Sequence, residues 1–329
     1  MDTFKAFWVE KKDKEVRQSI INRSIDELPE SEVLIRVLYS SLNYKDALSA
    51  KGLPGVTRNY PHTPGIDVSG VVEASSVPSV KKGDEVIVTG FDLGMNTPGG
   101  FGQYVKVPAS WVVRIPTNMG LRESMIYGTA GLTAALCYGK LLSMNATPGD
   151  GPVLVTGSTG GVGSVAVSLL ASEGYEVIAC TGKSDQHDYL KGIGATSVVS
   201  RQELEDPDTG PMGKEKFGHV VDTVGGLILS NALKSLCYGG SAAICGLVAS
   251  PKFDATVLPF ILRNINLLGV DSVEIPLDEK RVAWDRLANE WNLKNLESLA
   301  SEISLEQLAP EIENIFSGKV VGRKVVCLK

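Results

Sequence analysis

The sequence has few histidines and none of the cysteine pairs that typically hold a metal ion. Only three histidines, His62, His187 and His219, are present, and none lies within four residues of a cysteine or of another histidine. The spacing typical of a zinc site is therefore absent. The five cysteines are dispersed and include no C-x-x-C pair, which favours free thiols over a disulfide framework. We therefore expect no metal site and a cytoplasmic protein.

Long apolar runs and an excess of positive charge are also missing. No apolar run approaches the roughly 20 residues of a membrane-spanning helix, and MDTFKAFWVEKKDKE lacks the apolar core of a signal peptide. The net charge of −6, from 32 basic and 38 acidic residues, argues against a nucleic-acid or anionic-membrane surface. A chain of 329 residues, 43% of them hydrophobic, has the length and the core of two domains.

Residues 1–125 have the pattern of a β-rich domain. Short β-branched runs, separated by turn sequences such as KGLPG, PHTPG and KKGDE, predict strands. These strands cover 33–39, 68–73, 85–89 and 103–107. Short strands at this spacing are typical of a small barrel or sandwich.

Strands and helices alternate between residues 126 and 274. We expect strands at 153–156, 176–180, 197–200, 219–222, 242–246 and 266–270, and helices at 128–142, 161–173, 185–193 and 228–237. This alternation predicts an α/β fold with a doubly wound parallel sheet, the Rossmann architecture. Beyond residue 278 the chain is charged and helical, and its closing strand, GRKVVCLK, is expected to pair back with the first domain. The predicted domains are therefore 1–125, completed by about 275–329, and 126–274.

The segment TGSTGGVGS, residues 156–164, lies between a predicted strand and a predicted helix. This is the context of a dinucleotide-binding loop, although serine replaces the first glycine of G-x-G-x-x-G. Glycines allow the backbone to approach a pyrophosphate, and the helix N-terminus offers N–H groups to it. A flexible glycine turn is the alternative interpretation. The predicted cofactor-binding residues of this loop are Ser158, Thr159, Gly160, Gly161, Val162 and Gly163.

The end of the second strand of this domain indicates which dinucleotide binds. NAD-selective sites usually place a carboxylate there, on the ribose 2′-hydroxyl. This sequence instead has Thr181, Gly182 and Lys183, and Arg201 follows the third strand. A hydroxyl and two cations suit an adenosine 2′-phosphate, although both cations could instead be ordinary surface residues. We therefore predict NADP(H) as the cofactor.

Several longer segments resemble the medium-chain dehydrogenase/reductase superfamily over essentially the whole chain. The residues that carry the resemblance are TPGIDVSGVV (63–72), KKGDEVIV (81–88), GGFGQYVKVP (99–108), GTAGLTAALC (128–137) and TGSTGGVGS. SSLNYKDALSAKG (40–52) and PFILRNINLLGVDSV (259–273) are similar to the YhdH/YhfP/AcuI group within its quinone-oxidoreductase branch. That group includes NADPH-dependent acryloyl-CoA reductases.

The resemblance implies a GroES-like β-barrel catalytic domain, a Rossmann domain, a homodimer, and a cofactor in an interdomain cleft. At the zinc-ligand positions of the superfamily this chain has Asn43-Tyr44 and Gly65-Ile66-Asp67, which implies a zinc-free enzyme. Hydride transfer without a metal needs an acceptor that is already electrophilic, such as an acyl-CoA thioester with a conjugated double bond, or a quinone. Reduction of acryloyl-CoA is the leading hypothesis. NADPH:quinone reduction and non-catalytic NADPH binding remain the alternatives.

The resemblance also places site residues. Asn43 and Tyr44 are the leading hydrogen-bond donors. For Tyr44 three roles stay open: binding the nicotinamide ribose, stabilising an enolate, or acting as an acid. A half-buried tyrosine that packs the barrel is the alternative. The local pattern N-Y-K-D-A-L, independently of the resemblance, predicts that Asp46 caps a helix. Arg323 is expected to contact the cofactor or a CoA thioester, with a surface arginine as the alternative. The residues expected to flank the nicotinamide are Gly246, Leu247 and Leu262, and Ser272 is also expected to bind the cofactor.

Overall fold

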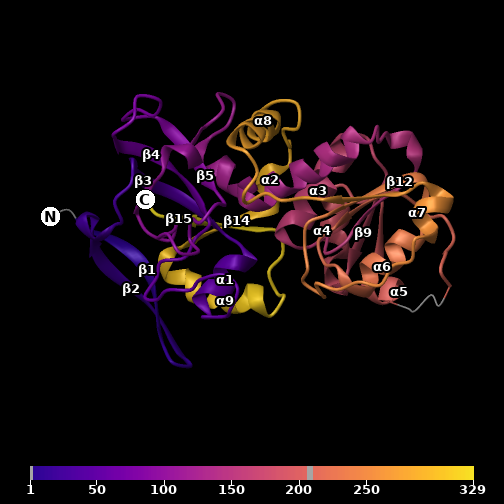
Figure 1. Ribbon diagram of the computed structural model, residues 1–329, viewed down its shortest axis with the longest axis horizontal. Helices are drawn as coiled ribbons and strands as arrows, with labels where there is room; N and C mark the ends of the chain where they lie inside the picture. The colour runs from indigo at the N-terminus through magenta and orange to yellow at the C-terminus, as the bar shows by residue number, and fades with distance from the viewer. Residues whose placement is uncertain (1–2, 206–209) are drawn as a thin grey trace. The chain divides into compact units, whose positions relative to one another are not determined.

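The computed structural model describes residues 3–205 and 210–329 (Figure 1). The chain clusters into two compact units. Unit 1 consists of Met1–Thr129, Ser272–Asn289 and Ala300–Lys329, and unit 2 consists of Ala130–Asp271 and Glu290–Leu299. The units differ from the division read from the sequence mainly at residues 290–299, which belong to unit 2.

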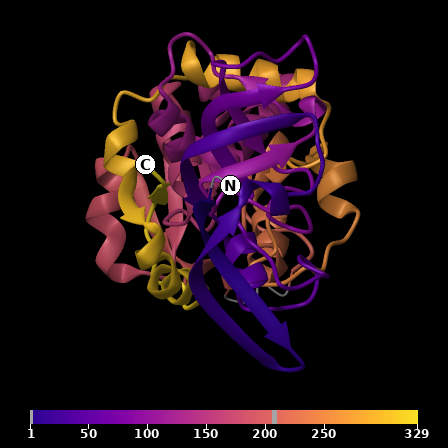
Figure 2. The same ribbon diagram turned by 90° about the vertical axis from the view of Figure 1, so that its left-hand side faces the viewer.

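Unit 1 begins with a β-hairpin for which the sequence analysis assigned no strands. Strand β1 (Thr3–Lys12) pairs antiparallel with β2 (Glu15–Ser24), with Lys12 opposite Glu15. Asp13 in the turn has a φ of 55°, a conformation that aspartate tolerates better than most residues. The indigo hairpin reaches away from the rest of unit 1 in Figures 1 and 2.

The main sheet of unit 1 has seven strands. Its order is β14-β15-β3-β4-β5-β7, and β6 also pairs with β3. The strands are β3 (Val33–Leu42), β4 (Asp67–Ser75), β5 (Glu85–Thr89), β6 (Tyr104–Val107), β7 (Val113–Arg114), β14 (Ala300–Ser304) and β15 (Arg323–Cys327). All four strands predicted in this part of the chain are present. Strand β15 pairs antiparallel with β3, which confirms the predicted return of the C-terminal strand.

Alternating apolar residues of β3, such as Val33, Ile35 and Val37, point into the core of unit 1. Its helices are α1 (Tyr44–Ala50), α8 (Leu277–Ala288), α9 (Leu308–Phe316) and the start of α2 (Leu121–Ser143), with short 3-10 turns at Ile25–Glu27, Ala109–Trp111 and Leu305–Gln307. The last turn opens with the predicted capping box, in which the Ser304 N–H donates to Gln307 Oε1 at 2.9 Å.

Unit 2 contains a six-stranded sheet in which every pair of neighbouring strands is parallel. The order β10-β9-β8-β11-β12-β13 is the 3-2-1-4-5-6 order of the doubly wound dinucleotide-binding fold. The strands are β8 (Val153–Val155), β9 (Val177–Thr181), β10 (Ser197–Ser200), β11 (Phe217–Asp222), β12 (Leu236–Ile244) and β13 (Asn266–Gly269). The predicted Rossmann architecture is confirmed.

Most helices of unit 2 connect consecutive strands of this sheet, and α2 precedes its first strand. The helices are α3 (Gly161–Ser172), α4 (His187–Gly192), α5 (Arg201–Glu205), α6 (Gly226–Lys234), α7 (Leu258–Arg263) and the greater part of α2, with 3-10 turns at Pro148–Asp150, Ser184–Gln186 and Leu296–Leu299. The helix predicted at 228–237 was placed too far along the chain. The segment is strand from Leu236 onward, because Leu236 pairs with Phe217 and is buried in the core of the sheet.

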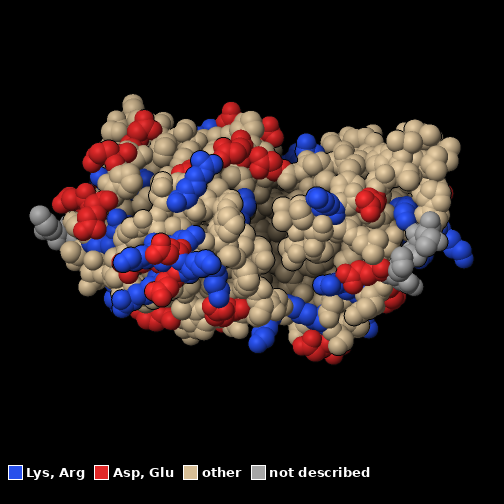
Figure 3. Space-filling model, turned by 60° about the horizontal axis from the view of Figure 1, so that its bottom comes forward, with Lys and Arg blue, Asp and Glu red and all other residues tan. Residues whose placement is uncertain are grey.

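Within the described ranges, no helix has both the length and the apolar character needed to cross a bilayer. On the face shown in Figure 3, the basic side chains of unit 1 are interspersed with acidic ones.

Candidate active site and cofactor loop

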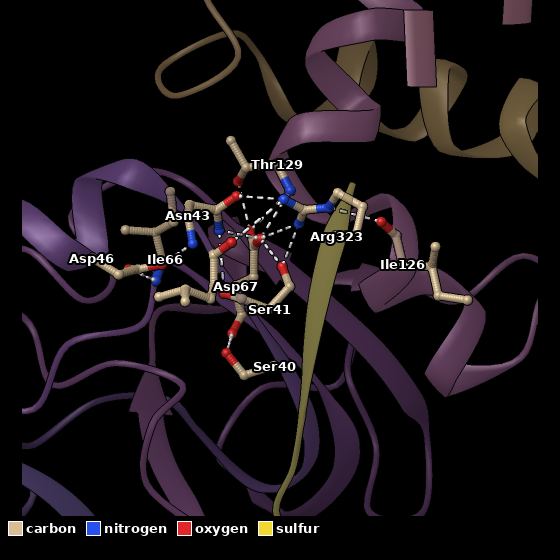
Figure 4. Close-up of polar contacts among 10 residues, drawn as sticks. Ser40, Ser41, Asn43, Asp46, Ile66, Asp67, Ile126, Thr129 and Arg323 are labelled. Carbon is tan, nitrogen blue, oxygen red and sulfur yellow. Dashed lines mark hydrogen bonds and ion pairs between the residues drawn. The ribbon is translucent and has the colours of Figure 1, made fainter. Parts of the chain in front are cut away.

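Asp67, the first residue of β4, is the centre of a buried polar network in unit 1 (Figure 4). Its Oδ2 accepts hydrogen bonds from Ser41 Oγ at 2.5 Å and from Asn43 Nδ2 at 2.7 Å. Its Oδ1 accepts from Thr129 Oγ1 at 2.5 Å, and the Thr129 N–H donates to both oxygens. The carboxylate is completely buried, so these donors replace the water that it loses.

Arg323, the first residue of β15, supplies the positive charge of the network. Its side chain is 2% exposed, and Nη2 lies 3.9 Å from Asp67 Oδ2. Nη2 also donates to Ser41 Oγ at 2.8 Å, Nη1 to Asn43 Oδ1 at 3.2 Å, and Nε to the Ile126 carbonyl at 2.9 Å. Burial lowers the pKa of Arg323, and the negative charge of Asp67 opposes this shift.

Gly128 allows helix α2 to reach this network. Its φ of 51° and ψ of −159° interrupt the helix, and a side chain is strained in this region. A Cβ at residue 128 would lie 2.4 Å from Ser41 Oγ and 2.5 Å from Asp67 Oδ2. A glycine is therefore required where the backbone turns to present the Ile126 carbonyl and the Thr129 N–H.

Asp46 fixes the start of α1 beside the network. The Asn43 N–H donates to Asp46 Oδ2 at 2.8 Å and the Ile66 N–H donates to Oδ1 at 2.9 Å. Asp46 thus completes a capping box for α1, in line with the capping role expected from the sequence. Burial raises the pKa of Asp46 to about 7, and the charge of Asp67 acts in the same direction.

Tyr44 is the accessible member of the predicted catalytic residues. Its side chain is 39% exposed, whereas Asn43 is 8% exposed. The Tyr44 ring stacks on Phe316 of α9, with ring centroids 6.0 Å apart and an interplanar angle of 3°. Lys51 Nζ lies 5.7 Å from the centroid of the Phe316 ring. Helix α1 packs against α9, so Phe316 holds the Tyr44 ring at the surface of unit 1.

Ser41, Thr129 and Phe316 were not predicted from the sequence, and Asp67 was identified only as a departure from the zinc-ligand pattern. An aspartate among the apolar residues of IDVSGVV was the available signal, because a buried carboxylate requires a buried partner. No comparable pattern in the sequence pointed to Phe316.

These side chains do not fit a zinc ion. Zinc is usually bound by thiolates and imidazoles, whereas the corresponding positions here carry Asn43 and Asp67. The amide of Asn43 and the carboxylate of Asp67 are already bonded to each other and to their neighbours. Among residues 3–205 and 210–329, no group of three or more histidine, cysteine, aspartate or glutamate side chains could hold a metal ion.

The predicted dinucleotide loop lies at the carboxyl end of β8 in unit 2. Gly157 has a φ of 60°, and a Cβ on Gly163 would lie 2.3 Å from the Gly157 carbonyl oxygen. The Ser158 hydroxyl donates to the Val155 carbonyl at 2.6 Å and closes the turn. Gly160 caps α3, a helix of 12 residues whose first N–H groups have no helical acceptor. Together these features form the backbone cradle that a pyrophosphate fits.

The residues predicted to bind the 2′-phosphate lie at one edge of the same sheet. Thr181 ends β9 and pairs with Ser200 of β10, so Arg201 starts α5 beside Thr181 and Gly182. The Lys183 N–H donates to Thr181 Oγ1 at 3.1 Å. Burial lowers the pKa of Lys183, and Asp185 opposes this shift. The structure thus brings the predicted cations to one strand edge.

Four further residues that were expected to bind the cofactor do not all belong to the same unit. Gly246, Leu247 and Leu262 lie in unit 2, and Ser272 lies in unit 1. Gly246 packs tightly against Thr223, whose carbonyl oxygen would lie 1.9 Å from a Cβ at position 246. Leu247 and Leu262 are exposed, whereas Ser272 is buried.

The chain matches known families and proteins along nearly its whole length. Residues 29–117 match the alcohol dehydrogenase GroES-like domain, and residues 161–289 match the zinc-binding dehydrogenase family. The chain is 42% identical over 325 residues to the acrylyl-CoA reductase AcuI of Ruegeria pomeroyi, covering 98% of both chains. It is 41% identical over 326 residues to Bacillus subtilis YhfP, named as a quinone oxidoreductase, covering 99% of both.

Solved structures of similar proteins contain nucleotide cofactors. The Salmonella enterica yhdH oxidoreductase in complex with NADP is 39% identical, with a TM-score of 0.96 over 99% of this chain and 100% of that one. The Bacillus subtilis yhfP structure has NAD bound, and it is 41% identical with a TM-score of 0.97 over the full length of both chains.

Proposed function

Because the chain belongs to the medium-chain dehydrogenase/reductase superfamily, we propose that it uses NADPH to reduce acryloyl-CoA to propionyl-CoA. The carbon–carbon double bond of this acceptor is conjugated to a thioester carbonyl and is therefore electrophilic without a metal. Hydride adds to C3, negative charge develops on the carbonyl oxygen, and a proton then adds to C2.

One observation carries this proposal. The Tyr44 side chain is exposed, and it lies next to the buried polar network of Asn43, Asp67 and Arg323, which occupies the zinc-ligand positions. A metal-free site must supply hydrogen-bond donors to the oxygen on which charge develops. Tyr44 is the accessible donor, because the Asn43 amide is engaged by Ser41 and Asp67. We therefore assign to Tyr44 the hydrogen bond to the enolate oxygen.

Asn43 and Arg323 act on the reaction through Tyr44. The guanidinium of Arg323 is buried and donates to Ile126, Asn43 and Ser41, which argues against the direct contact with cofactor or thioester expected from the sequence. Asn43 is the N-cap of α1, and Tyr44 is the first residue of that helix. Arg323, Asp67 and Asn43 are thus positioning residues that fix the backbone carrying Tyr44.

The cofactor is held by unit 2. The residues from Ser158 to Gly163 bind the pyrophosphate with backbone N–H groups of the α3 N-terminus, and Lys183 and Arg201 bind the 2′-phosphate. The bound nicotinamide ring supplies the hydride. We also assign Gly246, Leu247, Leu262 and Ser272 to the nicotinamide side.

A quinone is the second candidate acceptor, and one observation favours it. Tyr44 and Phe316 are partly exposed aromatic side chains, a kind of residue on which the ring of a quinone can stack. A relative at 41% identity also carries the quinone oxidoreductase name.

The experiment that tests the proposed function measures NADPH oxidation with acryloyl-CoA, with a panel of quinones, and with no acceptor. Rapid, saturable turnover of acryloyl-CoA with formation of propionyl-CoA is the expected result. Faster turnover of quinones would instead assign quinone reduction, and turnover of no acceptor would assign a non-catalytic NADPH-binding protein.

We further propose a cytoplasmic homodimer. All five cysteines are free, which suits a reducing compartment. Strand β13 is an edge strand of the unit 2 sheet, and the nearby helix α7 exposes Ile261. Light scattering should give twice the 35.0 kDa chain mass.

A further inference from the structure

We propose that Glu205 sets the cofactor preference of this enzyme by competing with the 2′-phosphate of NADPH for Arg201. The inference rests on the proposed binding of the 2′-phosphate by Lys183 and Arg201. Glu205 weakens the binding of the 2′-phosphate. It thereby reduces the preference of the enzyme for NADPH over NADH.

The position of Arg201 follows from the sheet register. Strand β10 ends at Ser200, opposite Thr181 of β9, and α5 begins at the next residue. A Cβ at Gly182 would lie 3.7 Å from Arg201 Cδ and 3.8 Å from Arg201 Cβ. The aliphatic part of Arg201 therefore lies against Gly182, at the strand end where the adenosine ribose binds in this fold.

Arg201 is already paired with a carboxylate of its own helix. Its Nε donates to Glu205 Oε1 at 2.8 Å, one helical turn away. The Arg201 side chain is 56% exposed, and an exposed pair of this kind contributes little stability. The guanidinium can therefore turn toward a phosphate, and its two Nη groups carry four further N–H donors. The phosphate nevertheless has to share Arg201 with Glu205.

The carboxylates of Glu203 and Glu205 in α5 also produce a negative electrostatic potential at the carboxyl end of β9. The pKa of Cys180 is raised to about 12, first by burial and then by the charges of Glu203 and Glu205, whereas the charge of Arg201 lowers it. Since Cys180 precedes Thr181, a phosphate bound at this strand end would experience the same negative charges.

Glu203 and Glu205 have different hydrogen-bond partners. Glu203 accepts a hydrogen bond from the Ser200 N–H at 2.8 Å, and its own N–H donates to Ser200 Oγ at 3.3 Å. Glu203 is thus occupied in capping α5. Of these two glutamates, only Glu205 contacts Arg201. Glu205 is therefore the residue that competes with a phosphate for the Arg201 guanidinium.

The test is a fluorescence titration of NADPH and NADH, without any acceptor, on the wild-type enzyme and on Glu205→Gln. We expect the variant to bind NADPH about 3- to 10-fold more tightly, the effect of removing one unit charge that acts through solvent. NADH binding should change by less than about twofold, because NADH has no 2′-phosphate, and raising the salt concentration should reduce the gain for NADPH.

Two further variants control the measurement. Glu302→Gln breaks the Arg122–Glu302 pair of unit 1, which has the same 2.8 Å distance, and should leave both affinities unchanged. Adding Glu205→Gln to Arg201→Gln should give a clearly smaller gain, because the residue for which Glu205 competes is then absent and only the direct repulsion between Glu205 and the phosphate is removed.

Three outcomes would overturn the inference: unchanged NADPH affinity in Glu205→Gln, equal tightening of NADPH and NADH, or an undiminished gain in the Arg201→Gln background. Failure of the proposed function is a separate result, because a protein that reduces no acceptor can still show the predicted shift in NADPH affinity.

Discussion

Arg323 Nη2 and Asp67 Oδ2 lie 3.9 Å apart, with the two side chains 2% and 0% exposed. The pair joins β15, near the C-terminus, to the start of β4. Ser41 Oγ completes it, since it accepts from Arg323 and donates to Asp67. The carboxylate and the guanidinium thus stabilise each other in a region from which water is excluded.

Replacing Asp67 by asparagine should destabilise unit 1 strongly. The variant keeps the shape of the side chain but leaves the buried guanidinium without its counter-charge, which costs about 3–5 kcal/mol. Urea unfolding followed by circular dichroism measures the change. Glu302→Gln, which breaks an exposed Arg–Glu pair, is the control and should cost less than about 1 kcal/mol. An equally small loss for both variants would contradict this account of the network.

Removing the phenol of Tyr44 should slow the chemical step. If Tyr44 donates to the enolate oxygen, Tyr44→Phe should lower kcat by roughly 100-fold, as the loss of one oxyanion donor does elsewhere. The affinity for NADPH should not change, because the stacked ring remains. Stopped-flow oxidation of NADPH with acryloyl-CoA measures the rate.

The matched control for Tyr44→Phe is Tyr238→Phe, which removes a phenol from an exposed tyrosine of unit 2. It should leave kcat unchanged. A Tyr44→Phe enzyme with wild-type kcat would show that Tyr44 does not stabilise the enolate, and a loss confined to NADPH affinity would assign it to the ribose.

Reversing the charge of Lys183 should alter cofactor choice. Lys183→Asp places a carboxylate where a 2′-phosphate is expected, so NADPH should bind roughly 10- to 100-fold more weakly, in keeping with the loss of a charge-assisted hydrogen bond. NADH should be affected far less. Isothermal titration calorimetry with both nucleotides makes the comparison, and equal losses for both would remove Lys183 from the phosphate site.

The buried His62 should make stability depend on pH. Burial lowers the pKa of His62, and no hydrogen-bond partner of its Nε2 is found among the described residues. The folded state therefore keeps the ring neutral, while the unfolded chain takes up a proton below a pH of about 6.5. The stabilisation is present above that pH and is lost as the pH falls toward the folded pKa.

His62→Gln should remove this part of the pH dependence. Between pH 7.5 and 5.5, the wild type should lose more unfolding free energy than the variant. Urea titrations at the two pH values measure the difference, and the other two histidines are common to both proteins. Parallel losses in wild type and variant would show that His62 titrates in the folded state as it does in the unfolded chain.

Much of the fold follows from local patterns in the sequence. β-Branched runs between glycine and proline turns predicted strands β3 to β6, and regular alternation predicted the parallel sheet of unit 2. The first hairpin was missed because its charged strand EVRQSIINRS has no clear apolar alternation. Its pairing is set by the contact with β1, which a local pattern does not contain.

The candidate site was only partly predictable for a similar reason. The glycine loop and the cations at 183 and 201 are local signals with a known physical use. The network around Asp67 joins residues up to 282 positions apart, as in the Arg323–Ser41 hydrogen bond. Such partners are brought together only by the tertiary fold. The sequence therefore predicted Asn43 and Arg323 as site residues, but it did not predict that the Asp67 carboxylate connects them.

The most direct test of the central claim follows the hydride itself. The enzyme is given acryloyl-CoA and NADPH that carries deuterium at the transferable position of the nicotinamide ring, in ordinary water. We predict propionyl-CoA with one deuterium at C3 and a solvent-derived hydrogen at C2, formed in step with NADPH oxidation. NADPH oxidation without deuterium in propionyl-CoA, or no reduction of acryloyl-CoA while quinones are reduced, would contradict the account.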